Sequence, residues 1–226
     1  VYVQIAGTNT EGVMMKSDQI PGDKFNVGDR VKVYVKKIKD SFKGPQIQVS
    51  RSNIGFVRKL FELEVPEIAS GEVKIKNIAR DPGNRAKVAV YSDRPNVDAI
   101  GACVGNRGNR INTIVNELNG EKIDLVEYSD DPLEYIARAL SPAKVLSVET
   151  NDSLNMSQVI VPDDKLSLAI GKQGQNVRLA AKLTGWKIDV KPESYIKPKT
   201  DVDNTDVDYE LTELSDDSSF DMSDLE

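Results

Sequence analysis

The feature that most constrains this chain of 226 residues is an internal repeat. Residues 88–126 contain Val-Ala-Val, then a glycine-rich run, then Asn-Gly-Glu-Lys-Ile-Asp-Leu. Residues 159–190 repeat this order and close with Thr-Gly-Trp-Lys-Ile-Asp-Val. The glycines at 105 and 108 correspond to those at 171 and 174, an offset of 66 residues. Because self-similarity of this kind means that one structural unit has been used twice, the sequence predicts two modules of the same fold.

Each unit places the pattern Gly-x-x-Gly between two predicted helices, at residues 105–108 and 171–174. This is the signature of the KH module, whose loop clamps about four nucleotides by their backbone. Glycine has no Cβ, so a phosphate can approach the main chain, and the helix that follows offers free N–H groups to the anion. The predicted RNA-binding residues are Gly105, Asn106, Arg107, Gly108, Arg110, Gly171, Lys172, Gln173, Gly174, Gln175, Asn176 and Arg178.

Other kinds of glycine loop do not fit these residues. A lone Gly-x-x-Gly is a weak signal because helix caps produce it often, but two copies in register are much more specific. Gly101, Gly105 and Gly108 do not form the Gly-x-Gly-x-x-Gly of a dinucleotide site. Gln173 stands where a phosphate-binding P-loop would need Ser or Thr. We therefore interpret both loops as KH loops.

Residues 1–52 read as short alternating strands, which is typical of a small barrel. In residues 30–38 the valines fall on one face, and Arg30, Lys32, Tyr34 and Lys36 fall on the other. A basic and aromatic outer strand is what an OB-fold uses to bind single strands. The alternative is a solvated strand face whose lysines have no function. A loop through residues 43–45 leads to the next predicted strand, at residues 46–49.

The chain divides into four predicted parts of a mixed fold class. Residues 1–52 form an all-β, OB-type barrel that lacks its first strand. Residues 53–128 and 129–192 form two α+β KH domains of the prokaryotic type (type II). Residues 193–226 form an acidic tail, whose high charge and few large apolar groups predict disorder.

Within the KH domains the apolar pattern predicts particular core residues. We expect a helix over residues 53–68, with Pro66 near its end and with the buried anchors Phe56, Leu60, Phe61 and Leu63. A second helix, over residues 132–140, should stop at Pro142. We expect Trp186 in the core, with a base-stacking platform as the alternative.

The net charge of −6 averages two unlike parts. Residues 201–226 contain eleven acidic and no basic side chains. Removing them from the totals of 36 acidic and 30 basic residues leaves 25 acidic and 30 basic, a net charge of +5 for residues 1–200. A basic body with an acidic tail fits a nucleic-acid partner. It fits a solubilising tail on a neutral globule equally well.

The lack of histidine and the presence of only one cysteine limit the metal-binding, catalytic and disulfide chemistry that we expect of this chain. The sequence has no histidine, which is the commonest metal ligand and neutral-pH base. Its one cysteine, Cys103, excludes a disulfide within the chain and suits a reducing cytoplasm. We expect Cys103 to be a packed side chain, and the acidic pairs at 130–131 and 163–164 to cap helices. No apolar run approaches the length of a membrane span. We therefore predict a cytoplasmic protein that is not an enzyme, with no catalytic residue, metal or cofactor and no membrane partner.

Several stretches resemble the NusA family of bacterial transcription factors. They are residues 60–68, 78–83, 101–105 and 166–180, the last reading Leu-Ser-Leu-Ala-Ile-Gly-Lys-Gln-Gly-Gln-Asn-Val-Arg-Leu-Ala. The similarity runs from residue 1 to about residue 192, and the barrel resembles the ribosomal-protein-S-one type of RNA-binding domain. The resemblance implies a factor that binds single-stranded nascent RNA and RNA polymerase and modulates pausing, termination and antitermination, with other antitermination factors as further partners.

The resemblance leaves two questions open. The family begins with a polymerase-binding domain that is not in this sequence, so we expect a piece of a longer protein whose polymerase contact lies mainly in that domain. Related modules also occur in an RNA-binding adaptor of ribosome assembly or translation, and in ribonuclease complexes that contain the exoribonuclease polynucleotide phosphorylase. In that enzyme one KH module precedes the barrel, whereas here two follow it.

Overall fold

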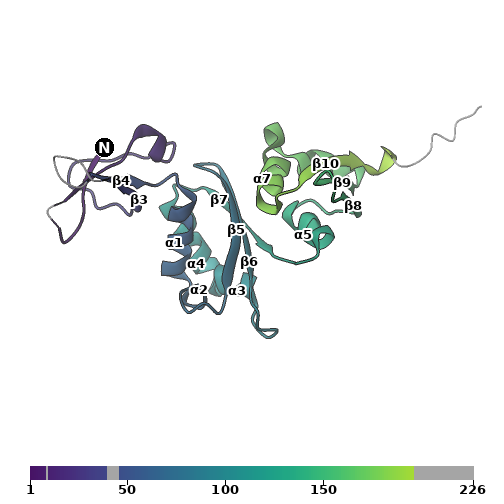
Figure 1. Cartoon of the computed structure of the whole chain (residues 1–226), viewed down its shortest axis with the longest axis horizontal. Helices are drawn as coiled ribbons and strands as arrows, with labels where there is room; N and C mark the ends of the chain where they lie inside the picture. Colours follow the sequence, from purple (N-terminus) through teal and green to yellow (C-terminus); the bar gives the residue numbers. More distant parts are fainter. Residues whose placement is uncertain (9, 40–45, 196–226) are drawn as a thin grey trace, which may run out of the picture. The chain divides into compact units, whose positions relative to one another are not determined.

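The computed structural model describes residues 1–8, 10–39 and 46–195 (Figure 1). Its N-terminal region is a four-stranded sheet with strand order β1-β2-β4-β3. β2 and β4 are parallel, and the other neighbours are antiparallel. The β region that the sequence predicts for the N-terminal part is therefore present as one small mixed sheet. The elements are β1 (Tyr2–Gln4), β2 (Glu11–Val13), η1 (Lys16–Asp18), β3 (Tyr34–Lys39) and β4 (Gln46–Ser50).

The predicted basic strand is shorter than its sequence pattern suggests. β3 begins at Tyr34 rather than at residue 30, and its register with β4 shifts between Val35 and Lys37. A register shift of this kind ends the strict alternation of faces. Tyr34 packs against the core of the following domain, with its ring beside Gly55. The ring therefore does not form part of an open RNA-binding face.

The lysines of that segment are also engaged. The Lys36 ammonium lies 3.0 Å from the Asp18 carboxylate. Lys32 lies 3.6 Å from Glu117 and 3.8 Å from Glu64. The prediction that Tyr34 lies on an open face of this strand is therefore wrong, whereas the lysines stay exposed beside acidic partners that are distant in sequence, and RNA binding by this region stays a prediction. The loop predicted through residues 43–45 lies outside the described residues.

The first KH module packs its helices on one face of a three-stranded sheet, as Figure 1 shows for α1, α3 and α4. The strand order is β5-β6-β7, with β6 antiparallel to β5 and parallel to β7. Phe56, Leu60, Phe61 and Cys103 are among the buried residues of this core. The elements are α1 (Ile54–Glu64), α2 (Pro66–Ala69), β5 (Lys74–Asp81), β6 (Arg85–Tyr91), α3 (Ala99–Val104), η2 (Asn106–Gly108), α4 (Asn109–Glu117) and β7 (Lys122–Glu127).

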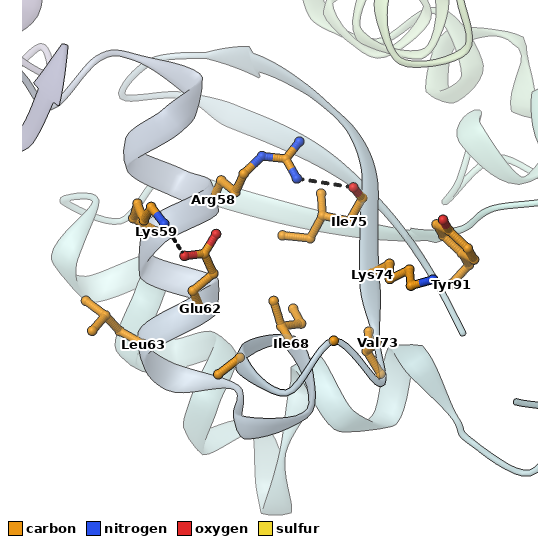
Figure 2. A pocket seen from close by; sticks show the side chains of 11 residues that line it. Arg58, Lys59, Glu62, Leu63, Ile68, Val73, Lys74, Ile75 and Tyr91 are labelled. Atoms are coloured by element: carbon orange, nitrogen blue, oxygen red, sulfur yellow. Dashed lines mark hydrogen bonds and ion pairs between the residues drawn. The ribbon is translucent and has the colours of Figure 1, made fainter. Parts of the chain in front are cut away.

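The helix predicted over residues 53–68 is two helices. Asn53 caps α1 by accepting a hydrogen bond from the Gly55 amide at 2.7 Å. Pro66 begins α2 instead of ending α1, because its missing N–H costs nothing at the first helical position. The prediction for Leu63 is wrong: it is 68% exposed in the last turn of α1, and Figure 2 shows it pointing away from β5.

The second KH module repeats the first. Its sheet has the order β8-β9-β10, again with an antiparallel pair followed by a parallel one. As predicted, the helix α5 ends just before Pro142. The elements are α5 (Pro132–Ala139), β8 (Ser147–Asn151), β9 (Met156–Val161), η3 (Asp163–Lys165), α6 (Leu166–Ile170), η4 (Lys172–Gly174), α7 (Gln175–Thr184), β10 (Lys187–Pro192) and η5 (Glu193–Tyr195). The predicted fold class, two KH modules behind an N-terminal β region, is confirmed.

Buried charges join the N-terminal region to the first KH module. Arg80 on β5 pairs with Glu121, with both side chains almost fully buried, and its Nη1 donates to the carbonyls of Arg51 and Asn53. Arg51 in turn donates to the carboxylate and the carbonyl of Glu117 at the end of α4, both at 2.8 Å. These bonds fix the start of the first module against the end of the barrel.

Neutral contacts dominate where the two KH modules meet. The outer face of the β5-β6-β7 sheet contributes Ala79 and Ala89 to the same core as α5 and α7. Asn77 donates to the Leu183 carbonyl at 2.8 Å.

One buried charge also lies at this junction. Lys87 is fully buried, and its ammonium lies 3.0 Å from the Asp124 carboxylate and 2.9 Å from the Ser141 carbonyl. Desolvation lowers the pKa of Lys87 below its ordinary value.

The acidic tail was predicted to begin at residue 193, but residues 193–195 form η5, and the Ser194 amide donates to the Asp163 carboxylate at 3.0 Å. The prediction of disorder is therefore wrong for these three residues, and for residues 196–226, which lie outside the described residues, it stays a prediction. The three domain boundaries, at residues 52, 128 and 192, likewise stay proposals.

Candidate nucleic-acid interface

The two glycine loops have the same backbone conformation. Gly105 and Gly171 have φ near +72° and +75° with extended ψ, and Gly108 and Gly174 are left-handed. Between them, Arg107 and Gln173 are also left-handed, each with φ of 52°. A non-glycine residue in this region is uncommon and is retained where the surroundings require it. The repeated glycine spacing therefore encodes one loop geometry, built twice.

The first glycine of each loop is required by close packing. A Cβ on Gly105 would lie 2.7 Å from the Arg110 Cγ, and a Cβ on Gly171 would lie 2.8 Å from the Asn176 backbone nitrogen. At Gly174, by contrast, a Cβ would meet nothing within 4 Å. The main chain is therefore open to solvent on that side, where the absence of a side chain leaves room for a phosphate.

Both loops lead directly into helices. α4 and α7 begin after Gly108 and Gly174, which as glycines offer no side chain at the N-cap position. In α4 the Asn109 side chain accepts a hydrogen bond from the Arg110 amide at 2.9 Å. The positive end of the helix dipole and the first N–H groups favour an anion at this position. Asn106 and Arg107 are exposed in the first loop, and Lys172 and Gln173 in the second. Each loop thus presents one exposed cation beside the N-terminus of a helix.

Two of the predicted RNA-binding residues hold the fold together. Arg110 donates to the Ala102 carbonyl at 2.7 Å and to Glu67 at 2.9 Å. Asn176, at the equivalent position of the repeat, is 3% exposed and donates to the carbonyls of Leu140 and Ala169, both at 3.0 Å. Each side chain ties its loop to the preceding helix. Their direct contact with RNA stays a prediction, and the structural role is one that the sequence did not reveal.

Two further predicted residues lie where the modules meet. Gln175 donates to the Asp81 carboxylate at 2.7 Å, on the turn between β5 and β6. Arg178 is exposed, lies 3.9 Å from the same carboxylate, and donates to the Gln173 carbonyl at 3.4 Å. The second loop is thereby fixed against the first module, and the Arg178 side chain keeps access to solvent.

A basic hollow of about 590 Å³ adjoins the second loop. It is lined by Lys172 of the loop and by Arg85 and Lys122, which begin β6 and β7 of the first module. No acidic residue is among its lining residues. Arg85 and Lys122 were missed by sequence reasoning because only the fold brings the starts of these strands to the second loop. The hollow is suited to an anionic ligand that extends from one module to the other.

A hollow of about 870 Å³ between α1 and β5 has a different character (Figure 2). Lys59 is paired with Glu62, and Arg58 donates to the Ile75 carbonyl at 3.2 Å. Its cations are therefore engaged, and it shares no lining residue with the basic hollow beside the second loop.

The remaining residues singled out in the sequence lie as follows. Cys103 is fully buried, and desolvation raises the pKa of its thiol to about 12, so it is packed and unreactive. Asp131 caps α5 through the Leu133 amide, and Asp163 accepts a hydrogen bond from the Ser194 amide at 3.0 Å. Within the described ranges, no group of three or more potential ligand residues could hold a metal ion.

Comparisons with known proteins agree with this geometry. Residues 51–128 match the model of the NusA-like first KH domain, and residues 132–198 match that of the NusA-like second KH domain. The "Transcription termination/antitermination protein NusA" of Halalkalibacterium halodurans is 54% identical over 194 residues, which cover 86% of this chain and 50% of that protein.

The chain belongs to the NusA family.

Two other NusA proteins show the same extent of similarity. That of Bacillus subtilis is 52% identical over 86% of this chain and 52% of its own length. That of Thermus thermophilus is 52% identical over 83% of this chain and 48% of its own length. The chain thus spans about half the length of these NusA relatives. Their names describe transcription factors and mention no catalytic activity.

The two NusA KH models include both glycine loops, which fall at residues 105–108 and 171–174. One solved structure, described as "Crystal structure of APE1850", aligns with 60% of this chain and 95% of its own at 24% identity and a TM-score of 0.45, too distant a likeness to inform the function. Within the described residues, no helix is both long and apolar enough to span a membrane.

Proposed function

We propose that this chain is the RNA-binding part of a transcription factor of the NusA type, which binds single-stranded nascent RNA and modulates pausing, termination and antitermination. The observation that carries this proposal is the pair of glycine loops with one backbone conformation. Each loop leads into a helix whose N-cap is glycine and presents an exposed cation. Backbone donors and cations suit phosphate, and unstacked bases suit a KH cleft.

The proposed partners follow from the family. RNA polymerase would be bound mainly by parts of a longer protein, and other antitermination factors are further candidates. We place this activity in the bacterial cytoplasm and assign the chain no catalytic step. Membership of the NusA family favours this function over an adaptor of ribosome assembly or a subunit of a ribonuclease complex.

The proposed RNA-binding residues are those of the two loops and their following turns. Among them, Asn106, Arg107, Lys172, Gln173 and Arg178 are exposed and open to direct contact with RNA. Gly105, Gly108, Gly171 and Gly174 would act by shaping the loop, and Arg110, Gln175 and Asn176 by holding it in place.

Two double variants test the loops. We expect Lys172→Asp with Gln173→Asp, and Asn106→Asp with Arg107→Asp, to weaken binding of single-stranded RNA at least roughly tenfold, because carboxylates replace donors and cations at the phosphate. Aspartate tolerates the left-handed conformation of Arg107 and Gln173, so the fold should survive.

A matched control is available on α1. Lys59→Asp with Leu63→Asp alters two exposed residues by the same net charge and should leave RNA affinity unchanged. Thermal melts of all variants check the fold. Unchanged RNA affinity in both loop variants would remove the basis of the proposal. Recovery of RNA polymerase with the full-length protein, rather than of ribosomal subunits, tests the wider role.

A further inference from the structure

A second basic surface runs along helix α7 beside the β5 strand. Gln175 at the start of α7 bonds to Asp81 at the end of β5, and the Leu183 carbonyl at the end of α7 accepts from Asn77 near the start of β5. α7 therefore runs antiparallel beside β5. Because β5 pairs only with β6 in its sheet, its other edge is free of strand partners within the described residues.

Cations line this path from one end to the other. Arg178 and Lys182 are both exposed, and a spacing of four residues puts them on the same face of α7. Lys76 is exposed on β5 next to Asn77, where the ladder with β6 shifts its register. In the described part of the chain, no carboxylate lies within ion-pair distance of Lys76 or Lys182. We call Arg178, Lys182 and Lys76 the α7 strip.

The strip ends at an aromatic hollow of about 310 Å³. Its walls include Tyr128 from the connection between the modules, Tyr135 from α5, and Trp186 from the turn before β10. The rings of Tyr128 and Tyr135 meet edge to face at 5.0 Å, and the Lys76 ammonium lies 4.3 Å from the centre of the Tyr128 ring. Trp186, expected in the core, is only partly buried.

The walls of this hollow also include one acidic residue, Asp130. Asp130 accepts a hydrogen bond from the Tyr128 hydroxyl at 2.7 Å. The hydrogen bond of Lys76 to Tyr128 raises the pKa of its ammonium, so Lys76 stays cationic at neutral pH. The volume lies at the lower limit for small-ligand sites, about 300 Å³, and suits one flat ring better than a peptide segment.

We propose that the α7 strip carries the continuation of a single RNA strand beyond the second glycine loop, and that one unstacked base enters the hollow of Tyr128 and Trp186. The strip cations bind the phosphates, and the rings bind the base. This combination of a basic track with aromatic stacking is the general chemistry of single-strand binding. The inference rests on the proposed function, because the strand enters from the second loop.

The geometry sets the length of RNA required. Gln175 and Leu183 are eight residues apart on α7, which is about 12 Å along the helix axis. A strand that fills only one KH cleft, about four nucleotides, cannot also reach the hollow. A strand that is several nucleotides longer on the strip side can reach it. Long and short RNAs should therefore give different signals from the hollow.

Trp186 supplies that signal because it is the single tryptophan of the chain. We would titrate the full chain with an unpaired RNA of roughly fifteen nucleotides and with one of about four nucleotides, and record Trp186 emission and affinity together. We expect the long RNA to quench Trp186, since a stacked base lies against its ring, and the short RNA to bind without quenching.

Charge reversal sharpens the test. Lys76→Glu and Lys182→Glu should each lower the affinity for the long RNA by about threefold or more and reduce the quenching of Trp186. Neither variant should change the affinity for the short RNA. The control is Lys59→Glu, which alters an exposed lysine on α1 and should change neither the affinity for the long RNA nor the quenching. Melting curves verify that all three variants fold.

The outcomes separate the two proposals. If the long RNA binds without altering Trp186 emission, and both strip variants bind it as the control does, the strip is overturned while the glycine loops stand. If neither RNA binds the wild type, the proposed function fails and the strip fails with it. Quenching by a protein partner but not by RNA would also overturn the strip, in favour of a protein-docking surface.

Discussion

The two KH modules reach the same geometry with different chemistry. At equivalent positions of the repeat, Arg110 and Asn176 tie the glycine loop to the preceding helix, one through an ion pair with Glu67 and the other through a buried amide. After the glycine that ends the second helix, the first module has Glu121 and the second has Trp186. The first module thus uses charge where the second uses neutral groups.

The neighbours of each module explain this difference. Glu121 is buried because Arg80 reaches across to the carbonyls at the end of the barrel, so the ion pair joins two domains. Trp186 lies where the two KH modules meet, in a hollow that it lines with Lys76 and Tyr135, and it is only partly buried. Repeated backbone geometry therefore depends on the glycines, while the residues around them reflect what each module packs against.

The largest loss of stability should come from breaking the buried Arg80–Glu121 pair between the N-terminal region and the first KH module. Glu121→Ala leaves Arg80 buried without its carboxylate and should lower the free energy of unfolding by about 3 kcal/mol or more. Glu121→Gln, which keeps the shape and an acceptor, should cost less. Denaturant unfolding measures both, and faster exchange of the Gly83 amide, which donates to Glu121, locates the damage. A loss below about 1 kcal/mol in Glu121→Ala would show that the junction does not need this pair.

At the loops, we expect the buried hydrogen bonds of Asn176 to contribute more to stability than the ion pair of Arg110 with Glu67. Asn176→Ala leaves the buried carbonyls of Leu140 and Ala169 without a donor and should cost about 2 kcal/mol. Arg110→Ala removes a partly exposed pair with Glu67 and should cost about 1 kcal/mol or less. Parallel unfolding curves of the two variants test the order, and a larger loss in Arg110→Ala would reverse the comparison.

A smaller effect is expected in the pH dependence of folding stability. Cys103 in the first module corresponds to Ala169 in the second, and burial raises the pKa of its thiol from 9.0 to about 12. The unfolded thiol ionises first as pH rises, so the folded state then holds more protons and its stability falls, by at most about 1.4 kcal/mol per pH unit.

Cys103→Ala isolates this contribution. The stability advantage of the wild type over Cys103→Ala should be constant below about pH 8 and should shrink as pH rises from about 9 towards about 11. Unfolding free energies of both proteins at matched pH values give the difference. A difference that is independent of pH would mean that the thiol is as accessible in the folded protein as in the unfolded one.

Local patterns allowed the prediction of the two KH modules. The glycine spacing gives the same left-handed loop twice, and the apolar periodicity of residues 132–140 gives α5 with its stop at Pro142. These features depend on residues that are near one another in sequence. Their geometry follows from steric rules that act over a single turn.

Apart from the division of residues 53–68 into two helices and the exposure of Leu63, the failures involve partners that are distant in sequence. Alternation in residues 30–38 could not reveal that Tyr34 packs beside Gly55 or that Lys36 meets Asp18. Nor could the loop signature reveal that Asn176 is buried under Leu140. For the same reason, sequence reasoning could not place Arg85 and Lys122 beside the second loop.

The central claim is that the two loops serve one RNA strand. Its most direct test is a titration of the chain with short single strands, long single strands and a hairpin at two salt concentrations. A strand of roughly ten or more unpaired nucleotides should bind much more tightly than a four-nucleotide strand, because a second loop on the same strand binds at high effective concentration. Affinity should fall with salt. Equal affinity for long and short strands, or a hairpin stem that binds as well as the long single strand, would contradict the claim.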